Sequence, residues 1–399
     1  MTPAARRQDS FLGARCRLDR PVPPDLCPSV EGLFDFRDVK LAETGDLGHK
    51  LSAVPETLAW SAYSDPALPV LERQRIFALA WQYVGHVGEL GDEAGYVAGR
   101  VGDIPVVVTR DRGGVFRAFL NVCRHRGSVL AAGAAARETL QCPYHAWTYG
   151  LDGTLKAAPR SNREPGFDCE GISLRPASVG AWGPFLFVNP DPEATPLADV
   201  LGELPELVAN AGVVVDRLKL HGRAESTVEA NWKLVSENFL ECYHCAVAHP
   251  GFSAVVDVSA DAYELALGDS FSSQFGPVRE NNKGLDTKGE VARSQFHFLW
   301  PNTMINIFPG RTNFSIGPVL PAGPERTERY LDYFFGPEVD DVWISELLEL
   351  DSQVGAEDKV LVENVQRGVA TGLIDRGRLL PESERLIVDF QRRVRTALS

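Results

Sequence analysis

The feature that most constrains the fold of this chain is a pair of short cysteine–histidine motifs. Cys123 and His125 lie two positions apart, Cys142 and His145 lie three positions apart, and sixteen residues separate the two pairs. Two thiolates and two imidazoles at this spacing predict two short loops that close on one metal centre. The fold must therefore bring the tips of two hairpins together.

Two kinds of metal centre use this set of ligands. In a Rieske [2Fe-2S] cluster, two cysteines hold one iron and two histidines hold the other. A structural zinc ion also takes two Cys and two His, but zinc modules usually pair Cys with Cys in one loop and His with His in the other. Here each loop supplies one of each, so we favour the Rieske cluster, with zinc as the alternative.

A second group of candidate ligands lies in the segment NWKLVSENFLECYHCAVAHP, residues 231–250. Glu237, Glu241 and His244 are spaced to share one face of a predicted helix. His249 would lie about 140° around a regular helix from His244, so both can reach one metal only if the helix ends between them. Pro250 favours such an ending. Two imidazoles and one carboxylate would form the facial triad of non-haem Fe(II) oxygenases.

Other interpretations of this second segment are open on the residues alone. A pair of histidines five positions apart is more often structural than metal-binding. A zinc-peptidase site fits less well, because its histidines are four positions apart with a Glu beside the first.

Taken together, the motifs resemble those of Rieske non-haem iron oxygenase alpha subunits, the superfamily of ring-hydroxylating and quaternary-ammonium oxygenases. The resemblance rests on CRHRG, on CPYHAWTYGLDG, and on NWK, EN and HP around the second segment. It implies that His244 and His249 bind a mononuclear Fe(II). It also implies that Glu241 is the bridging carboxylate between a Rieske histidine of one subunit and an iron-binding histidine of its neighbour.

The third iron ligand is expected far along the chain, in the segment EDKVLVENVQRG. This segment resembles the family segment in which an Asp precedes a Glu by five residues and supplies the carboxylate ligand. The match selects Asp358, with Glu363 at the later position. Asp351 and Glu357 are the alternatives if the alignment is shifted.

The fold class implied is α+β. From Phe77 onward, short runs of alternating apolar residues between Gly and Asp turns predict antiparallel strands. The resemblance then implies a small all-β Rieske domain and a helix-grip (START-like) catalytic domain with a curved antiparallel sheet. We expect an N-terminal arm with short helices at 1–76, loosely ordered over residues 1–50, the Rieske domain at 77–190 and the catalytic mononuclear iron domain at 191–399.

The function implied is that of a terminal oxygenase component. It would use O2 and NAD(P)H electrons, supplied by a reductase with or without a ferredoxin, to hydroxylate or oxidatively demethylate a small organic substrate. No G-x-G-x-x-G motif follows a predicted strand, so the nucleotide would bind to the partner. Family members form head-to-tail homotrimers, in which a closed ring places one subunit's cluster beside the next subunit's iron. The alternative is a Rieske-type electron-transfer protein without oxygen chemistry.

The substrate is open between a quaternary ammonium compound, toward which the ECYHC string weakly points, and an aromatic acid. Trp300 is a candidate for an aromatic cage around an ammonium group, and His297 for a substrate hydrogen bond, although a structural role fits His297 better. Cys242 and Cys245 are interpreted as small packing residues. The candidates for lining the pocket are Phe239, Val247, Phe298, Trp300, Ile305, Ile307 and Phe314.

Charge and composition restrict the partners and the compartment. The net charge of −14 and the pI near 5.1 argue against nucleic acid and anionic membranes as partners. The N-terminal residues lack the apolar core of a signal peptide. Seven cysteines, with two assigned to iron, do not indicate a disulfide framework, so a reducing cytoplasm is expected.

Overall fold

The computed structural model describes residues 54–399, so the predicted loosely ordered arm at residues 1–50 lies outside the described residues. The described part opens with the short helices η3 (Trp60–Tyr63), α1 (Leu68–Arg75) and η4 (Phe77–Leu79). Pro69 lies in the first turn of α1. The missing N–H of a proline costs nothing there, because the first N–H groups of a helix have no partner within it.

The first sheet is antiparallel and has the strand order β1-β10-β9-β4-β3-β2-β5. A separate three-stranded sheet, β6-β7-β8, lies within the same stretch of sequence. The strands are β1 (Gln82–His86), β2 (Gly95–Val101), β3 (Ile104–Arg110), β4 (Phe116–Leu120), β5 (Ala134–Ala135), β6 (Thr139–Gln141), β7 (Thr148–Gly150), β8 (Leu155–Ala157), β9 (Pro176–Trp182) and β10 (Phe185–Asn189). The 3₁₀ turns η5 (Val87–Leu90) and η6 (Ser161–Arg163) connect them.

The second sheet, also antiparallel, has the order β11-β17-β16-β15-β14-β13-β12. Its strands are β11 (Lys219–Val228), β12 (Glu264–Leu267), β13 (Phe271–Pro277), β14 (Arg293–Leu299), β15 (Thr303–Ile307), β16 (Asn313–Pro321) and β17 (Thr327–Phe335). The helical elements of this part are α2 (Leu197–Leu201), α3 (Leu204–Asn210), η7 (Val215–Arg217), α4 (Trp232–Phe239), α5 (Cys245–Ala248), α6 (Pro250–Val255), α7 (Asp341–Val369) and α8 (Arg385–Leu398).

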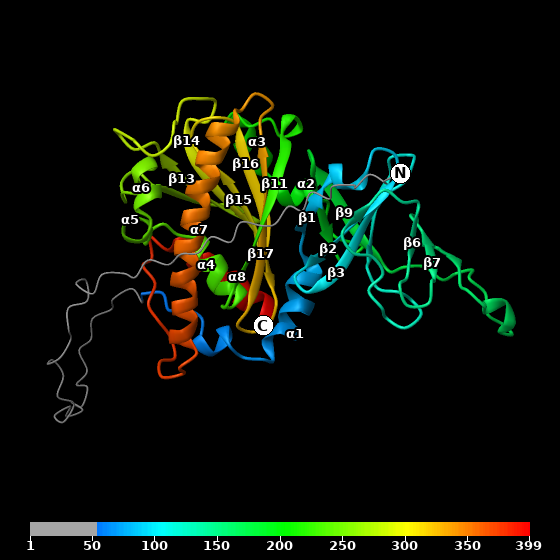
Figure 1. Cartoon of the computed structure of the whole chain (residues 1–399). Helices are drawn as coiled ribbons and strands as arrows, with labels where there is room; N and C mark the ends of the chain where they lie inside the picture. The colour runs from blue at the N-terminus through cyan, green and yellow to red at the C-terminus, as the bar shows by residue number, and fades with distance from the viewer. Residues whose placement is uncertain (1–53) are drawn as a thin grey trace, which may run out of the picture. The chain divides into compact units, whose positions relative to one another are not determined.

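The central strands of the second sheet are buried on both faces. Every residue of β15 and β16 is buried, which requires apolar layers on either side. On one face, Phe314 stacks on Phe185 of β10 with ring centroids 4.7 Å apart, in a cluster that also holds Ile305 and Ile307. On the other face, Phe296 and Phe308 pack with Trp343 of α7. Figure 1 shows α7, in orange, running along this sheet.

The predicted α+β fold class is confirmed: an all-β part is followed by a part in which helices pack on a seven-stranded antiparallel sheet. Within residues 54–399, no helix has the length and apolar character needed to cross a membrane.

One predicted element is wrong. The spacing of Glu237, Glu241 and His244 predicts a helix that includes all three, but α4 ends at Phe239. The carbonyl of Phe239 accepts a hydrogen bond from Gln274 Nε2 at 2.5 Å, and the backbone N–H of Tyr243 is bound by Glu241 Oε2. These bonds replace the helical bond between Phe239 and Tyr243, so residues 240–244 form an irregular turn.

Candidate metal centres

The two cysteine–histidine loops have the same local geometry. In each, the cysteine carbonyl accepts a hydrogen bond from the residue four positions later, Gly127 at 3.1 Å and Ala146 at 3.0 Å. Both of those residues have positive φ, 74° and 57°. This left-handed residue turns each loop back on itself. Glycine adopts this conformation without strain, whereas Ala146 pays a steric cost.

The four candidate cluster ligands divide into a buried pair and an exposed pair. Cys123 and Cys142 are buried in one apolar cluster, whereas His125 and His145 are exposed, with ring centroids 4.7 Å apart. Burial raises the pKa of Cys142, but the backbone N–H groups of Tyr144 and His145 outweigh it and lower that pKa overall. Buried sulfur ligands and exposed imidazoles would suit a two-iron cluster in which cysteines hold one iron and histidines hold the other.

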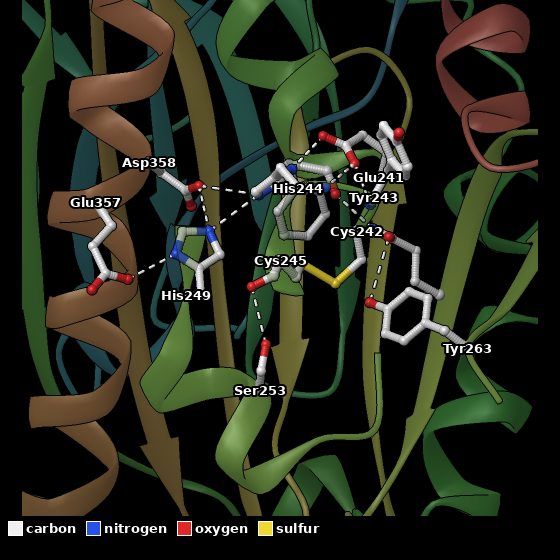
Figure 2. Close-up of polar contacts among 12 residues, drawn as sticks. Glu241, Cys242, Tyr243, His244, Cys245, His249, Ser253, Tyr263, Glu357 and Asp358 are labelled. Atoms are coloured by element: carbon white, nitrogen blue, oxygen red, sulfur yellow. Dashed lines mark hydrogen bonds and ion pairs between the residues drawn. A yellow bond between two sulfur atoms is a disulfide. The ribbon is translucent and has the colours of Figure 1, made fainter. Parts of the chain in front are cut away.

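The second site brings three ligand atoms to one point. The Nε2 atoms of His244 and His249 lie 3.1 Å apart. Asp358 Oδ1 lies 2.9 Å from His249 Nε2 and 3.4 Å from His244 Nε2. Three facial ligands with metal bonds of about 2.0–2.2 Å are roughly 3 Å from one another. The three ligand atoms, which Figure 2 shows converging, would therefore fit one metal ion.

Each histidine of this site is oriented by a carboxylate on its other ring nitrogen. His249 Nδ1 lies 2.8 Å from Glu357 Oε2, and His244 Nδ1 contacts Glu241 Oε1. Such contacts fix the tautomer that presents Nε2 to a metal. Of the three acids considered for the third ligand, the structure brings only Asp358 to the Nε2 atoms. Asp351 instead accepts a hydrogen bond from the hydroxyl of Tyr333.

The charges at this site favour a bound cation. Burial alone would lower the pKa of His244, but its contacts with Asp358 and Glu241 raise that pKa to about 9. Burial raises the pKa of Asp358, yet hydrogen bonds from His244, His249 and Asn238 hold it well below its usual range. A divalent ion would take the place of the imidazole protons in this negative field.

A cavity of about 100 Å³ opens beside the three ligand atoms. Phe239 lines it as expected, but the other predicted lining residues do not. Val247 is 90% exposed. Ile305, Ile307 and Phe314 face the opposite side of the sheet, and Phe298 and Trp300 belong to a different apolar cluster with α8. The rings that line the cavity are Phe239, Phe252, Tyr263, Phe296 and Phe308.

Of the two roles considered for His297, the structure supports the structural one. The side chain is fully buried, lies outside the cavity lining, and contacts Ser273 Oγ at 2.7 Å and Gln295 Oε1 at 3.1 Å. Burial lowers the pKa of His297 to about 3, so the ring is neutral.

The prediction that Cys242 and Cys245 are simple packing residues is wrong, because the two form a disulfide. It closes the irregular turn that carries Tyr243 and His244, and both cysteines line the cavity (Figure 2). The sequence carries the C-x-x-C spacing, but spacing alone does not say whether two cysteines are paired. In the structure the two Cα atoms lie 4.9 Å apart, within bridging range.

Sequence reasoning missed several cavity residues, among them Asn238, Tyr263, Gln274 and Arg329. Asn238, which hydrogen-bonds Asp358, belongs to the EN dipeptide of the second segment and had a local signal. Tyr263, Gln274 and Arg329 come from strands and loops remote in sequence, and no local pattern marks them.

Comparison with known proteins agrees with this geometry. Residues 80–173 match the Rieske [2Fe-2S] domain, and residues 215–399 match the ring hydroxylating alpha subunit (catalytic domain). The carnitine monooxygenase oxygenase subunit of Acinetobacter pittii is 36% identical over 319 residues, covering 79% of this chain and 85% of that protein. Chloroplastic choline monooxygenase of Arabidopsis thaliana is 34% identical over 334 residues, covering 80% and 77%.

Among solved structures, a quaternary ammonium Rieske monooxygenase superposes with a TM-score of 0.76 at 33% identity, covering 87% of this chain and 96% of that one. Its description concerns carnitine oxidation by gut microbiota and inter-subunit electron transfer. The match to the catalytic domain favours the oxygenase over the electron-carrier alternative, and the match to the Rieske domain favours the [2Fe-2S] cluster over zinc. The chain therefore belongs to the Rieske non-haem iron oxygenase alpha subunits, terminal oxygenases that use a [2Fe-2S] cluster, a mononuclear iron, O2 and electrons from a reductase.

Proposed function

We propose that this chain is the oxygenase component of a quaternary ammonium monooxygenase. The observation that carries the proposal is the cavity beside His244, His249 and Asp358, where five aromatic rings and three carboxylates meet. Aromatic faces and negative charge attract a trialkylammonium group. The relatives named above, which oxidise carnitine or choline by name, support this choice over an aromatic acid.

The roles of the site residues form part of the proposal. Cys123, His125, Cys142 and His145 would hold the [2Fe-2S] cluster, and His244, His249 and Asp358 would hold Fe(II). When bound, the cluster supplies electrons and the iron activates O2. The protein's own contribution is to orient both imidazoles through Glu241 and Glu357, and to place the substrate among the aromatic rings at the open side of the ligand triad.

A head-to-tail homotrimer is the assembly we propose. Among residues 54–399 no candidate cluster ligand contacts a candidate iron ligand. Cys123 and Cys142 pack in one apolar cluster of the N-terminal sheets, whereas His244, His249 and Asp358 line the cavity of the second sheet. The exposed His145 is free to meet a neighbouring subunit, and Glu241 already contacts His244. Electron transfer from one subunit's His145 to the next subunit's iron through Glu241 is supported by the inter-subunit transfer described for the similar structure.

The domain limits and the compartment also remain proposals. We place the domain limits after residues 76 and 190, consistent with sheets that end at Asn189 and begin at Lys219. We keep the cytoplasm as the compartment. In the cytoplasm, the Cys242–Cys245 disulfide would have to resist reduction by cellular thiols such as glutathione.

A single-turnover experiment tests the proposed function. The protein is reconstituted anaerobically with both metals, reduced with dithionite, and exposed to isotopically labelled O2 with carnitine, choline, γ-butyrobetaine or benzoate. One labelled oxygen atom is expected either in a hydroxylated ammonium product or in the carbonyl compound released with a tertiary amine. The carbonyl compound is reduced at once to an alcohol, before its oxygen exchanges with water, and is read by mass spectrometry. Label only in the product of the aromatic acid would refute the substrate class. No label in any product, with both metals loaded, would also count against it.

A further inference from the structure

A second hollow, between α7 and the strands β11 and β17, adjoins the iron-site cavity. The second hollow has a volume of about 510 Å³, five times that of the inner cavity. Four residues line both: Arg329, Leu331, Asp351 and Gly355. These four, which we call the neck, mark the place where a molecule passing from the outer hollow would reach the metal ligands.

The strand period of two and the helix period of 3.6 explain why these four residues lie together. Along β17, Arg329 and Leu331 are two positions apart and share the face toward α7. Along α7, Asp351, Gly355 and Asp358 follow helical spacing and share the face toward the cavity. A Cβ at Gly355 would lie 3.1 Å from Arg329 Nη2. A glycine inside a helix costs about 1 kcal/mol relative to alanine, and here it leaves room for the guanidinium head.

Among residues 54–399, Arg329 makes no ion pair, because no carboxylate lies within 4.0 Å of its guanidinium. Its Nε donates to Ser226 Oγ at 2.9 Å. Asp351, the acid of the neck, interacts with Arg329 electrostatically at longer range and is held by the hydroxyl of Tyr333. Arg223, which faces the other side of the sheet, is by contrast paired with Asp332 at 2.6 Å. Arg329 is also the only Lys or Arg that lines the inner cavity in the described part of the chain.

The position of Arg329 relative to the metal ligands suits a short zwitterion. Gly355, beside the guanidinium, precedes Asp358 by three residues, which is about 4.5 Å along the axis of α7. An ammonium group among the inner rings and an acid group at the neck would be joined by a chain of a few carbons. The planar guanidinium offers parallel N–H donors that match a carboxylate.

We propose that Arg329 is a specificity-determining residue that binds the carboxylate of a zwitterionic quaternary ammonium substrate, which enters between α7 and β17. This inference rests on the proposed function and deepens it. It predicts that a betaine acid is preferred over an ammonium compound without an acid group.

The test compares γ-butyrobetaine with its methyl ester, which keeps the ammonium group and the carbon chain but loses the negative charge. Both are offered to the wild type, to Arg329→Gln and to the control Arg326→Gln. Arg326 lies just before β17, is half exposed and pairs with Glu229 at 3.6 Å. Dissociation constants are measured by calorimetry on reduced, metal-loaded protein without O2, and kcat and KM are measured with O2 and a reductase.

We expect the wild type and the control to bind the acid about ten- to a hundredfold more tightly than the ester, as a charge-assisted contact allows. Arg329→Gln should lose most of this preference through weaker binding of the acid alone. KM for the acid should rise while kcat stays within about twofold, because the residue acts on binding. Unchanged values for the ester would show that the variant is folded, and Arg329→Lys should keep part of the preference.

An acid-to-ester ratio that is the same in Arg329→Gln and the wild type would overturn the inference, as would an equal loss in Arg326→Gln. If the wild type binds and oxidises both compounds equally well, Arg329 does not select for the carboxylate, whereas the proposed quaternary ammonium oxidation is still supported. If the wild type binds and oxidises neither these compounds nor choline, both fail together.

Discussion

Glu357 and His249 are joined by a contact of 2.8 Å between Glu357 Oε2 and His249 Nδ1, on the side of the ring opposite to Asp358. Two consecutive acids of α7 therefore hold one imidazole from both sides (Figure 2). Neighbouring positions on a helix point about 100° apart, which lets one carboxylate face the metal position while the other stays outside it. Gln353 Nε2 holds Glu357 in turn, at 2.9 Å from Oε1.

Replacing Glu357 should therefore weaken iron binding without abolishing it. In Glu357→Ala, His249 keeps its Nε2 but loses the contact that fixes its ring. We expect Fe(II) affinity to fall about 10- to 100-fold, as for other residues that orient a metal-binding histidine. Asp358→Ala should lose the iron altogether. Iron per chain and chelator competition measure the difference, with Glu346→Ala on the exposed face of α7 as the control.

The same experiment distinguishes orientation from ligation. The visible spectrum of the Rieske cluster should be identical in all variants, because its ligands lie in another domain. If Glu357→Ala lost iron as completely as Asp358→Ala, Glu357 would have to be a ligand, and the assignment of Asp358 alone would be wrong.

Glu241 should matter for electron transfer beyond its contact with His244. Glu241→Ala removes the carboxylate at His244 Nδ1 but leaves all three candidate iron ligands and all four candidate cluster ligands in place. We expect Fe(II) affinity to fall no further than in Glu357→Ala, so that both metals are retained at saturating Fe(II), whereas product formation should be abolished. Rapid-mixing spectroscopy should show a reduced cluster that is no longer oxidised when substrate and O2 are added. Product formation at the wild-type rate would refute the bridging role.

The candidate ligands could be predicted because their signals are local. Cys123 and His125, and likewise Cys142 and His145, lie within single loops, so the spacing of each pair alone predicts a shared centre. The choice of Asp358 as third ligand depended on the resemblance alone. Helix α7 carries many acids at helical spacing, and nothing in its own pattern separates Asp358 from Glu357.

The cavity lining could not be predicted, because the central strands of the sheet beneath it are buried on both faces. In a strand with one solvent face, alternation shows which residues face the core. In β15 all five residues are buried, so Ile305 and Ile307 are as apolar as Met304 and give no sign that they face away from the metal. A shift of one residue exchanges the two faces completely. The prediction that Trp300 lines the cavity is also wrong. Its ring packs on Phe390 of α8, in a different apolar cluster.

The Cys242–Cys245 disulfide should stabilise the turn that carries His244. Peptide mapping of unreduced protein is expected to find the two cysteines linked. A crosslink over so short a loop constrains the unfolded chain by roughly 2 kcal/mol at most. The double variant Cys242→Ser/Cys245→Ser should therefore show a Tm lower by a few degrees and weaker iron retention, with the cluster unaffected. Equal Tm and iron content in variant and wild type would show that the bond does not support the site.

Glu237 gives the catalytic domain a pH-dependent stability of its own. Its carboxyl group is buried and accepts hydrogen bonds from Tyr63 at 3.0 Å and from Gln391 Nε2 at 3.0 Å. Burial raises the pKa of Glu237 to about 7, and these hydrogen bonds only partly offset the rise. The Glu237 carboxyl group thus links α4 to α8 through Gln391 and to η3 through Tyr63. Burial favours the protonated form of this group.

The sign of the effect follows from proton binding. Because the folded pKa lies above the ordinary value of 4.5, the folded state binds more protons than the unfolded state between pH 4.5 and about 7. The contribution of this group is fully present below pH 4.5 and is lost as pH rises through about 7, by an amount on the order of 3 kcal/mol. Glu237→Gln can keep both hydrogen bonds, since Tyr63 and Gln391 both donate to Oε1.

Denaturant unfolding of the wild type and of Glu237→Gln at pH 5, 6, 7 and 8 tests this expectation. Other groups titrate equally in both proteins, so the difference between them isolates Glu237. The variant should gain stability relative to the wild type as pH rises from 5 to 8, with most of the gain below pH 7. Parallel pH profiles would mean that Glu237 has an ordinary pKa in the folded protein and that its surroundings are wetter than the structure shows.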